Sequence, residues 1–320
     1  KNYLIHKGLT MGQSRFESLS QELPSVLQSL EDKRRELKSQ GHKAGLWGGI
    51  LFFIAGGILL VLFGYPVILL LFVGVVSALI YYACVNSKSK DFSLHYKNEV
   101  IARVIGAFCN NATYSPNEGI NEEVFSNCGL FPCAPDRYHT EDLIHGYVDK
   151  TEFLCAEVHA EERRTQVGAK GQTRQYYVNI FRGFLFMADF HKDFKGKTTI
   201  LRDRFFKLRF GESRVKMENP DFENTFDVYS TDQVEARYLI TPSMMERLLE
   251  LDRKFGQGVT ISFRDSTILI AIPDSKNHFE ASIWSPITDV QSLSPEIETI
   301  SALISIVDDL NLNTRIWSKE

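Results

Sequence analysis

Cysteine and net charge are both scarce in this sequence. Its 320 residues carry a formal net charge of -4, which argues against a chain built to coat nucleic acid, so we expect no nucleic-acid partner. The cysteines are odd in number and irregularly spaced, a pattern that argues against a secreted disulfide framework and indicates a reducing compartment. They are Cys84, Cys109, Cys128, Cys133 and Cys155.

Familiar catalytic motifs are missing as well. The sequence has no Gly-x-Ser-x-Gly, no His-Glu-x-x-His, no phosphate-binding loop and no dinucleotide fingerprint. The stretch GAKGQT (168–173) joins two strand-like runs, and a hairpin turn accounts for it better than a phosphate site. We therefore expect no cofactor, and the sequence favours a protein that is not an enzyme.

Charge is absent from the whole stretch between Phe52 and Val76. Residues 46–63 and 67–85 are each long enough to cross most of a ~30 Å hydrocarbon layer at ~1.5 Å per residue. Gly64-Tyr65-Pro66 separates them, combining two chain-breaking residues with an aromatic that favours the membrane interface. Small residues recur at four-residue spacing, which permits close helix packing in lipid (Gly45, Gly49, Gly74 and Ala78). The stretch predicts a retained transmembrane helical hairpin rather than a cleaved signal peptide.

Basic residues flank this hairpin on the outer side of both spans, and its turn has no charge. Because Lys and Arg collect on the cytoplasmic side, both termini should be cytoplasmic. We expect a cytoplasmic amphipathic helical segment at 1–45, the hairpin at 46–85 and a cytoplasmic domain at 86–320. The flanking residues are Lys33, Arg34, Arg35, Lys38, Lys43, Lys88, Lys90 and Lys97.

Apolar residues recur every three or four positions between residues 14 and 40, which predicts an amphipathic helix. Lys33 fills the one missing position, and Pro24 should start a new helix or bend this one. The stripe either packs on the protein's own soluble domain or pairs subunits in a short coiled coil. Its members are Phe16, Leu19, Leu23, Val26, Leu30 and Leu37.

The remainder predicts an α+β domain with an antiparallel sheet and flanking helices. Helical patterns occur at 92–108, 121–128, 242–255 and 296–310, and the polar Thr140-Glu141-Asp142 suggests another helical turn. Alternating apolar residues predict two long strands within 151–163 and 173–190. Shorter strands are expected at 198–203, 205–210, 213–217, 226–230, 236–240, 258–265 and 266–273.

Two groups of side chains have the composition of a metal or acid–base site. Cys128, Cys133, His139 and His145 resemble a zinc set, although prolines crowd the loop and we expect no metal. The region of His159, Asp189 and His191 provides imidazole and carboxylate for a hydrolase-like reaction if the strands bring it together. Solvated cross-strand pairs are the alternative interpretation.

Cationic residues are concentrated between residues 189 and 216, with phenylalanines among them. If the strands at 189–216 face a bilayer, they would recognise anionic lipid through Lys192, Lys195 and Lys197. The alternative interpretation of the same pattern is an ordinary solvated sheet face.

Arg237 lies in the densest charged motif, DQVEARY. On a strand it would share a face with Glu235 and fix the sheet to the following helix, or it would bind a ligand carboxylate or phosphate.

Several longer stretches resemble the bacterial membrane-protein family called domain of unknown function 3137. They run from about residue 129 to 317 and include DDLNLNTRIW, FEASIWSPITD, residues 218–251, residues 181–198 and residues 146–161. The resemblance implies a two-span protein of the bacterial inner (cytoplasmic) membrane with a cytoplasmic C-terminal domain. It implies no activity and no catalytic residues.

Together these features predict a membrane-anchored, non-catalytic binding, sensing or scaffolding module. The lipid bilayer is the expected partner, together with a membrane protein or a second copy of the chain. The alternatives are a membrane-tethered hydrolase using the His159, Asp189 and His191 region, and recognition of anionic lipid by the basic strands.

Overall fold

The computed structural model describes residues 13–66, 68–109, 111–167, 172–190, 192, 194–202, 211–287 and 289–313; within the first helix, side chains are described for 18, 19 and from 21 onward. The chain forms two compact units. One contains the residues up to Val104 together with Phe279–Glu296, and the other contains Ile105–His278 and the residues from Ile297 onward.

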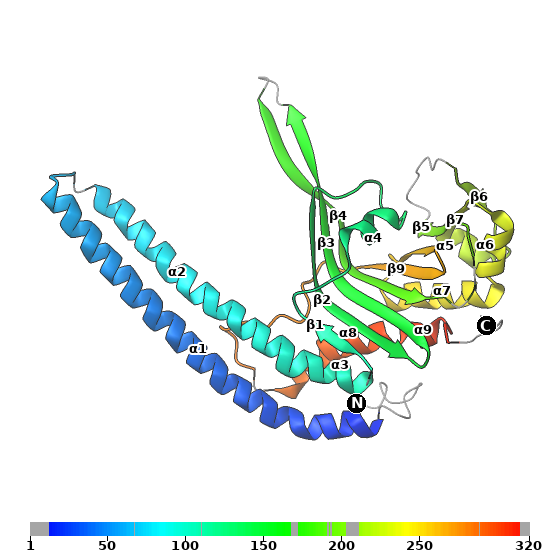
Figure 1. The fold of residues 1–320 in the computed structure, drawn as a ribbon, viewed down its shortest axis with the longest axis horizontal. Coiled ribbons are helices and arrows are strands. Elements are labelled where there is room, and N and C mark those ends of the chain that lie inside the picture. The colour runs from blue at the N-terminus through cyan, green and yellow to red at the C-terminus, as the bar shows by residue number, and fades with distance from the viewer. Residues whose placement is uncertain are drawn as a thin grey trace. The chain divides into compact units, whose positions relative to one another are not determined.

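The first unit is built around two long helices, α1 (Gln13–Leu62) and α2 (Leu69–Tyr96), which run side by side in Figure 1. A π-helical turn, η1 (Lys97–Ile101), and α3 (Ala102–Phe108) continue α2. Pro24 lies inside α1 and does not end it. The predicted amphipathic segment and first span are therefore one continuous helix of 50 residues, about 75 Å long at 1.5 Å per residue.

Glycines on α1 allow close approach of the two helices. A Cβ atom at Gly45 would lie 2.8 Å from the ring of Tyr81, and one at Gly49 would lie 3.1 Å from the backbone oxygen of Ser77. Both distances are too short for a comfortable contact, so these positions favour glycine. The predicted role of Gly45 and Gly49 in helix packing is confirmed by these contacts.

The buried stripe of α1 differs in detail from the predicted one. Leu27 is buried where Val26 was expected, and Arg34 occupies the position given to Lys33. The shift arises because α1 continues without a break through Pro24, so one 3.6-residue period runs along its whole length. The stripe continues into Gly41, Gly45 and Gly49, which are buried against α2 of the same chain.

The second unit contains one antiparallel sheet. In the described part of the chain, nine strands follow the order β1-β2-β3-β4-β9-β8-β5-β7-β6. Their bounds are β1 Thr113–Ser115, β2 Arg137–Val148, β3 Thr151–Val167, β4 Thr173–Asp189, β5 Thr198–Arg202, β6 Ser213–Val215, β7 Phe226–Ser230, β8 Thr260–Arg264 and β9 Thr267–Pro273. The expected α+β class with an antiparallel sheet is confirmed. The predicted strand at 205–210 lies outside the described residues.

Strands β3 and β4 form the longest hairpin, and their outer parts project from the sheet in Figure 1. Strand β2 pairs with β3 only as far as Glu161, and β9 pairs with β4 only as far as Gly183. Among the described residues, the outer parts of β3 and β4 therefore pair only with each other. Most of their side chains are exposed, which is why the apolar alternation of the inner halves is lost there.

Short helices accompany the sheet. Helix α4 (Glu122–Asn127) places Phe125 in a core with Val158, Leu185 and Leu269 from one sheet face. Helices α7 (Pro242–Lys254) and α9 (Ile306–Asp309) contact each other. The other helical elements that the structure describes are α5 (Pro220–Thr225) and α6 (Gln233–Leu239) in the sheet unit, the 3-10 turn η2 (Val290–Leu293) in the helical unit, and α8 (Ser294–Ile304), within which the chain passes from the helical unit to the sheet unit.

Two local predictions are wrong. Thr140-Glu141-Asp142 belongs to strand β2, where a bulge between Glu141 and Ile144 and a positive φ at Asp142 accommodate the polar cluster. Residues 236–239 form the end of α6 instead of a strand, and Ile240 is the C-cap of that helix. Asp232 caps that helix by accepting the N–H groups of Val234 and Glu235, and this cap outweighs the β preference of Tyr238 and Ile240.

Candidate functional site

A cleft of about 720 Å³ opens in the sheet unit beside the middle of β4, where β9 ends. This volume lies within the range of small-molecule sites in proteins. The loop after α4 forms one wall, and strands β3, β4, β5, β8 and β9 form the rest. The lining residues are Leu130, Phe131, Pro132, Glu162, Arg164, Asn179, Ile180, Phe181, Arg182, Leu201, Gly258, Thr260, Pro273, Asp274 and Ser275.

Aromatic side chains give the cleft a rigid apolar wall. Phe131 stacks on Phe125 with ring centroids 4.1 Å apart, and it meets Phe181 at 5.1 Å. Phe125 is fully buried in the core of the sheet unit, so the aromatic wall is anchored from behind. A ligand with a flat or aliphatic body would bury apolar surface here without a large loss of side-chain entropy.

Charged groups on the cleft rim differ in how well they are partnered. Glu162 accepts hydrogen bonds from Arg164 and from the Cys133 thiol, and these bonds lower the pKa of its carboxyl. The Nε atom of Arg182, in contrast, is buried and has no hydrogen-bond partner among the described residues. Because a buried donor without an acceptor is costly, Arg182 is the group best suited to meet an anionic part of a ligand.

Asp274, at the end of β9, links the cleft to a buried polar group beside it. The Nε2 atom of His278 lies 3.0 Å from the Asp274 carboxylate, and the backbone N–H of His278 donates to Glu157 at 3.0 Å. Burial raises the pKa of Asp274, but hydrogen bonds from the Lys276 N–H and from His278 outweigh it and lower that pKa. The loop after β9 is thereby fixed to strand β3.

Glu157 is a buried acid, only 5% exposed, in the middle of β3. Burial raises its pKa to about 7, with the negative charges of Asp142 and Glu141 adding to the shift. The His278 N–H and the charge of Arg182 act in the opposite direction but do not cancel it. Glu157 is therefore partly protonated near neutral pH, and it is a pH-sensitive group linked to the cleft through His278 and Asp274.

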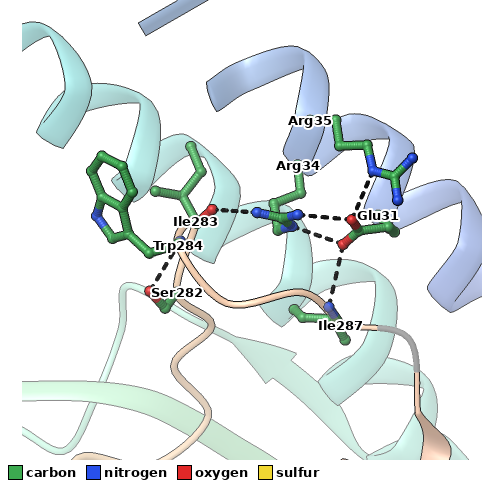
Figure 2. A network of polar contacts seen from close by, with 7 residues as sticks. All are labelled: Glu31, Arg34, Arg35, Ser282, Ile283, Trp284 and Ile287. Atoms are coloured by element: carbon green, nitrogen blue, oxygen red, sulfur yellow. Dashed lines mark hydrogen bonds and ion pairs between the residues drawn. The ribbon is translucent and has the colours of Figure 1, made fainter. Parts of the chain in front are cut away.

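The helical unit contains a second polar constellation, shown in Figure 2, which we call the clasp and define as Glu31, Arg34 and residues 282–287. Arg34 donates to both carboxylate oxygens of Glu31 at 2.7 and 2.8 Å, and to the backbone oxygen of Ile283 at 2.6 Å. Glu31 in turn accepts the N–H of Ile287 at 3.3 Å. Its pKa is lowered to about 2, first by Arg34, against the opposing effect of burial, with Arg35 and Ile287 contributing further.

The clasp holds Trp284 beside α1. Lys38 Nζ lies 5.0 Å from the centroid of the indole ring, and the ring of His42 meets it edge-on at 5.6 Å. The Nδ1 atom of His42 is also 2.6 Å from the hydroxyl of Tyr81 on α2. A second attachment lies at Glu280, which accepts from Ser93 and pairs with the buried Lys97 at 2.7 Å.

The three lysines predicted to bind lipid or ligand have different surroundings. Lys192 donates to the backbone oxygen of Tyr238 at 2.8 Å and lies 4.4 Å from that ring's centroid, and burial lowers its pKa. The side chains of Lys195 and Lys197 are exposed, while their backbone N–H groups bind Glu235 and Thr231. Residues 203–210 of the basic stretch lie outside the described residues.

Arg237 lies on helix α6 and does not share a strand face with Glu235. It donates to the backbone oxygens of Gln233 and Lys216 at 3.3 and 3.2 Å. Glu235 instead accepts the N–H groups of Lys195 and Gly196, at 2.9 and 2.6 Å. The predicted Glu235–Arg237 contact is replaced by a turn around the Glu235 carboxylate, because the helix directs the two side chains to different partners.

The zinc-like residues are held apart. Cys128 donates to the backbone oxygen of Phe125, Cys133 to Glu162, and His145 lies 2.7 Å from Glu152. The side chain of His139 is 70% exposed. Among the described residues, none of these four belongs to a cluster of three possible metal ligands.

The hydrolase-like residues are also separated in the sheet. His159 on β3 is opposite Arg182, whereas Asp189 lies seven residues further along β4, opposite Thr267. That separation is about 24 Å at ~3.4 Å per residue. His159 binds Asn179 at 2.8 Å, and His191 lies outside the described residues. The sheet therefore does not bring His159 and Asp189 together.

The cleft and clasp residues were missed because they come from distant segments. For Glu157 the sequence did contain a signal. This acid follows Phe153 and Cys155 at two-residue spacing along β3, so it occupies a position where an apolar residue is expected. An acid at an apolar position of a strand indicates a buried charge. Arg182, Asp274 and His278 offer no comparable pattern, because only the pairing of β4 with β9 brings them together.

The apolar surface of the helices is exposed in the helical unit. Two helices in the described part of the chain, Gln21–Leu62 and Leu69–Phe108, are long and apolar enough to cross a membrane. Only 11% of the most apolar 18-residue stretch of each helix is buried, whereas the core helix of a soluble protein is mostly buried. Their exposed side chains include Leu51, Ile54, Leu62, Leu71 and Phe72.

Comparison with known proteins gives one family and one remote structure. Residues 179–312 match the model of a family described as "Protein of unknown function (DUF3137)". No curated protein matches the chain. The chain is also similar to the crystal structure of the mycobacterial trehalose monomycolate transport factor A, TtfA, at 10% identity over 66% of this chain and 95% of that one, with a TM-score of 0.36. A score this low supports no conclusion about this protein. This match over residues 179–312 supports the resemblance to the DUF3137 family that the sequence predicted.

Proposed function

We propose that this protein is a membrane-anchored, non-catalytic binding module of the bacterial inner membrane. In this proposal α1 and α2 span the lipid bilayer as a hairpin, both termini are cytoplasmic, and the sheet unit binds a ligand in the cytoplasm. The observation that carries the anchoring is the apolar surface of α1 and α2, exposed over the length of a bilayer and free of charge between Phe52 and Val76.

The anchoring is tested in cells by fractionation and by reporters. A reporter that is active only outside the cytoplasm should be active when fused at Tyr65 and inactive when fused after Asn313. A protein released from membranes by alkaline carbonate, or a Tyr65 fusion that stays cytoplasmic, contradicts the proposed topology.

The binding role is supported by the cleft beside Phe131, Phe181 and Arg182. Its apolar wall and its unpartnered buried guanidinium nitrogen suit a ligand with an apolar body and one anionic group. The acids that line the cleft support binding rather than catalysis, since Glu162 is paired with Arg164 and Asp274 with His278.

Naphthalene-2-sulfonate is a suitable first probe because it combines an aromatic body with one anionic group. Saturation-transfer NMR on the full chain in nanodiscs should detect its binding, and Arg182→Gln should weaken the signal. Arg174→Gln is the matched control, since Arg174 is exposed on the outer part of the same strand. Equal binding by wild type and by both variants would place the probe elsewhere and count against the cleft.

A hydrolase remains the alternative function, but it would need a different set of residues from the one predicted. A membrane protein or a second copy of this chain is the further partner that we propose for the anchored module. Crosslinking of intact membranes followed by mass spectrometry would detect either one, and a strictly monomeric protein without partners would contradict this part of the proposal.

A further inference from the structure

The loop around Trp284 is held at a defined level of the helical hairpin. Trp284 contacts Lys38 and His42 of α1, and His42 also contacts Tyr81 of α2. Leu46 begins the apolar run four residues after His42, about 6 Å further along the helix axis at 1.5 Å per residue. Trp284 therefore lies beside the last polar turn before the apolar surface begins.

This level coincides with the headgroup layer if the hairpin spans a bilayer. The polar layer on each side of the ~30 Å hydrocarbon core is about 5–8 Å deep. Tryptophan and tyrosine favour this layer because their rings are apolar and their polar atoms remain hydrated. Trp284 and Tyr81 are both at this level, although they come from segments about 200 residues apart in the chain.

The indole ring remains accessible in spite of its neighbours. Trp284 is 53% exposed, a large fraction for a side chain held in place by two contacts. Lys38 lies over the ring, and Lys43, five residues further along α1, is exposed. These cations would face anionic phosphate groups at the same depth as the ring.

The clasp fixes the loop before any lipid is bound. The backbone oxygen of Ile283 accepts from Arg34, the N–H of Ile287 donates to Glu31, and the N–H of Trp284 donates to the Ser282 hydroxyl at 3.2 Å. Because the backbone on both sides of Trp284 is already ordered, insertion of the ring would cost little additional conformational entropy.

We propose that Trp284 is an interfacial lipid anchor, which the clasp presents to the headgroup layer of an anionic bilayer. This inference rests on the proposed membrane insertion of α1 and α2. It extends that function by assigning a lipid contact to a loop that lies outside both spans in sequence.

The test uses the full chain with one tryptophan at a time. The chain has three tryptophans, so Trp47→Phe with Trp317→Phe leaves Trp284 as the sole emitter, and Trp284→Phe with Trp317→Phe leaves Trp47. Both proteins are reconstituted into phosphatidylcholine–phosphatidylglycerol vesicles containing lipids brominated either high or low on the acyl chains. Trp47 is 67% exposed at the start of the apolar run and serves as the internal control.

We expect blue-shifted emission from Trp284 and stronger quenching by the lipids brominated near the headgroup than by those brominated near the chain ends. Adding Glu31→Gln should reduce that quenching because the loop is released. Quenching of Trp47 without quenching of Trp284 would overturn the anchor and leave the membrane-spanning hairpin intact. If neither tryptophan is quenched, the membrane insertion itself is wrong.

Discussion

Glu31 accepts a hydrogen bond from the backbone N–H of Ile287 at 3.3 Å, although the two residues are 256 positions apart. The chain leaves the sheet unit after His278, contributes Phe279–Glu296 to the helical unit and returns to the sheet unit at Ile297. Together with the junction at Val104, the two units are connected by the chain three times.

Replacement of Glu31 by glutamine should loosen the clasp. The change keeps the side-chain shape but removes the charge that Arg34 and Arg35 bind. Hydrogen bonds to charged groups contribute about 1.5–3 kcal/mol, so we expect exchange of backbone amides in residues 282–287 to become roughly tenfold faster or more. Hydrogen–deuterium exchange mass spectrometry measures this directly. Glu36→Gln, which affects an exposed pair with Lys33, should leave the same peptide unchanged, and equal protection in both variants would show that Glu31 does not hold the loop.

Stability should fall as the pH rises through the titration of Glu157. Its folded-state pKa of about 7 exceeds its ordinary value of 4.5, so the folded state binds a proton between these values that the unfolded state does not. The free energy of unfolding therefore decreases as the pH rises through this window, by about 3 kcal/mol at most. Thermal unfolding of the purified protein, from about pH 5 to about pH 8, should show this decline in wild type and a flatter profile in Glu157→Gln. Glu123→Gln, an exposed acid on α4, should retain the wild-type profile, and the same slope in all three proteins would contradict the assignment.

Alanine at Gly45 and alanine at Gly57 should have opposite effects. The new Cβ at Gly45 would lie 2.8 Å from the ring of Tyr81 and 3.1 Å from its backbone oxygen, whereas at Gly57 the nearest atom is 3.6 Å away on Leu70. Overpacking costs about 1–3 kcal/mol, while alanine favours a helix over glycine by about 1 kcal/mol. Gly57→Ala should match or exceed the thermal stability of wild type in detergent, and Gly45→Ala should fall below it. A stable Gly45→Ala protein would show that α1 and α2 pack less closely at this position.

Removal of the Glu235 carboxylate should destabilise the turn before β5. Glu235→Ala leaves the N–H groups of Lys195 and Gly196 without their acceptor, and we expect a loss of about 1–2 kcal/mol because the site is only partly buried. Arg237→Ala breaks longer, exposed hydrogen bonds and should change stability by less than about 0.5 kcal/mol. Chemical denaturation of the two variants measures the free energy of unfolding of each. A larger effect at Arg237 would favour the structural role first predicted for that residue.

Long and strongly periodic segments were predictable from the sequence. The long strands at 151–163 and 173–190, the helix opened by Thr241-Pro242 and the hairpin of β8 and β9 all occur where the pattern indicated. Thr241 caps α7 by accepting the Met244 N–H, which is the local interaction that the Thr-Pro pair predicts. Such elements depend on interactions within a few residues of the chain, so the sequence contains the necessary information.

Short segments were predicted less well because contacts from elsewhere compete with their own preferences. Residues 236–240 have strand-forming side chains, yet the cap at Asp232 and the contact of Glu235 with residues 195–196 favour a helix. Thr140-Glu141-Asp142 has the polar start of a helix, yet pairing of β2 with β3 places it in a strand that bulges after Glu141. In both cases a partner far along the chain decided the conformation.

The sequence by itself determined the two long apolar helices and the antiparallel α+β class, because run length and periodicity set how each segment buries its apolar side chains. Only the tertiary structure decided the positions of Arg182, Glu157 and Trp284. The pairing of β3 with β4 brings the charge of Arg182 near Glu157, and the hydrogen bond between Glu31 and Ile287, 256 positions apart, holds the loop of Trp284 beside α1. These arrangements depend on which strands pair and where a loop returns, and no pattern local to one segment specifies either.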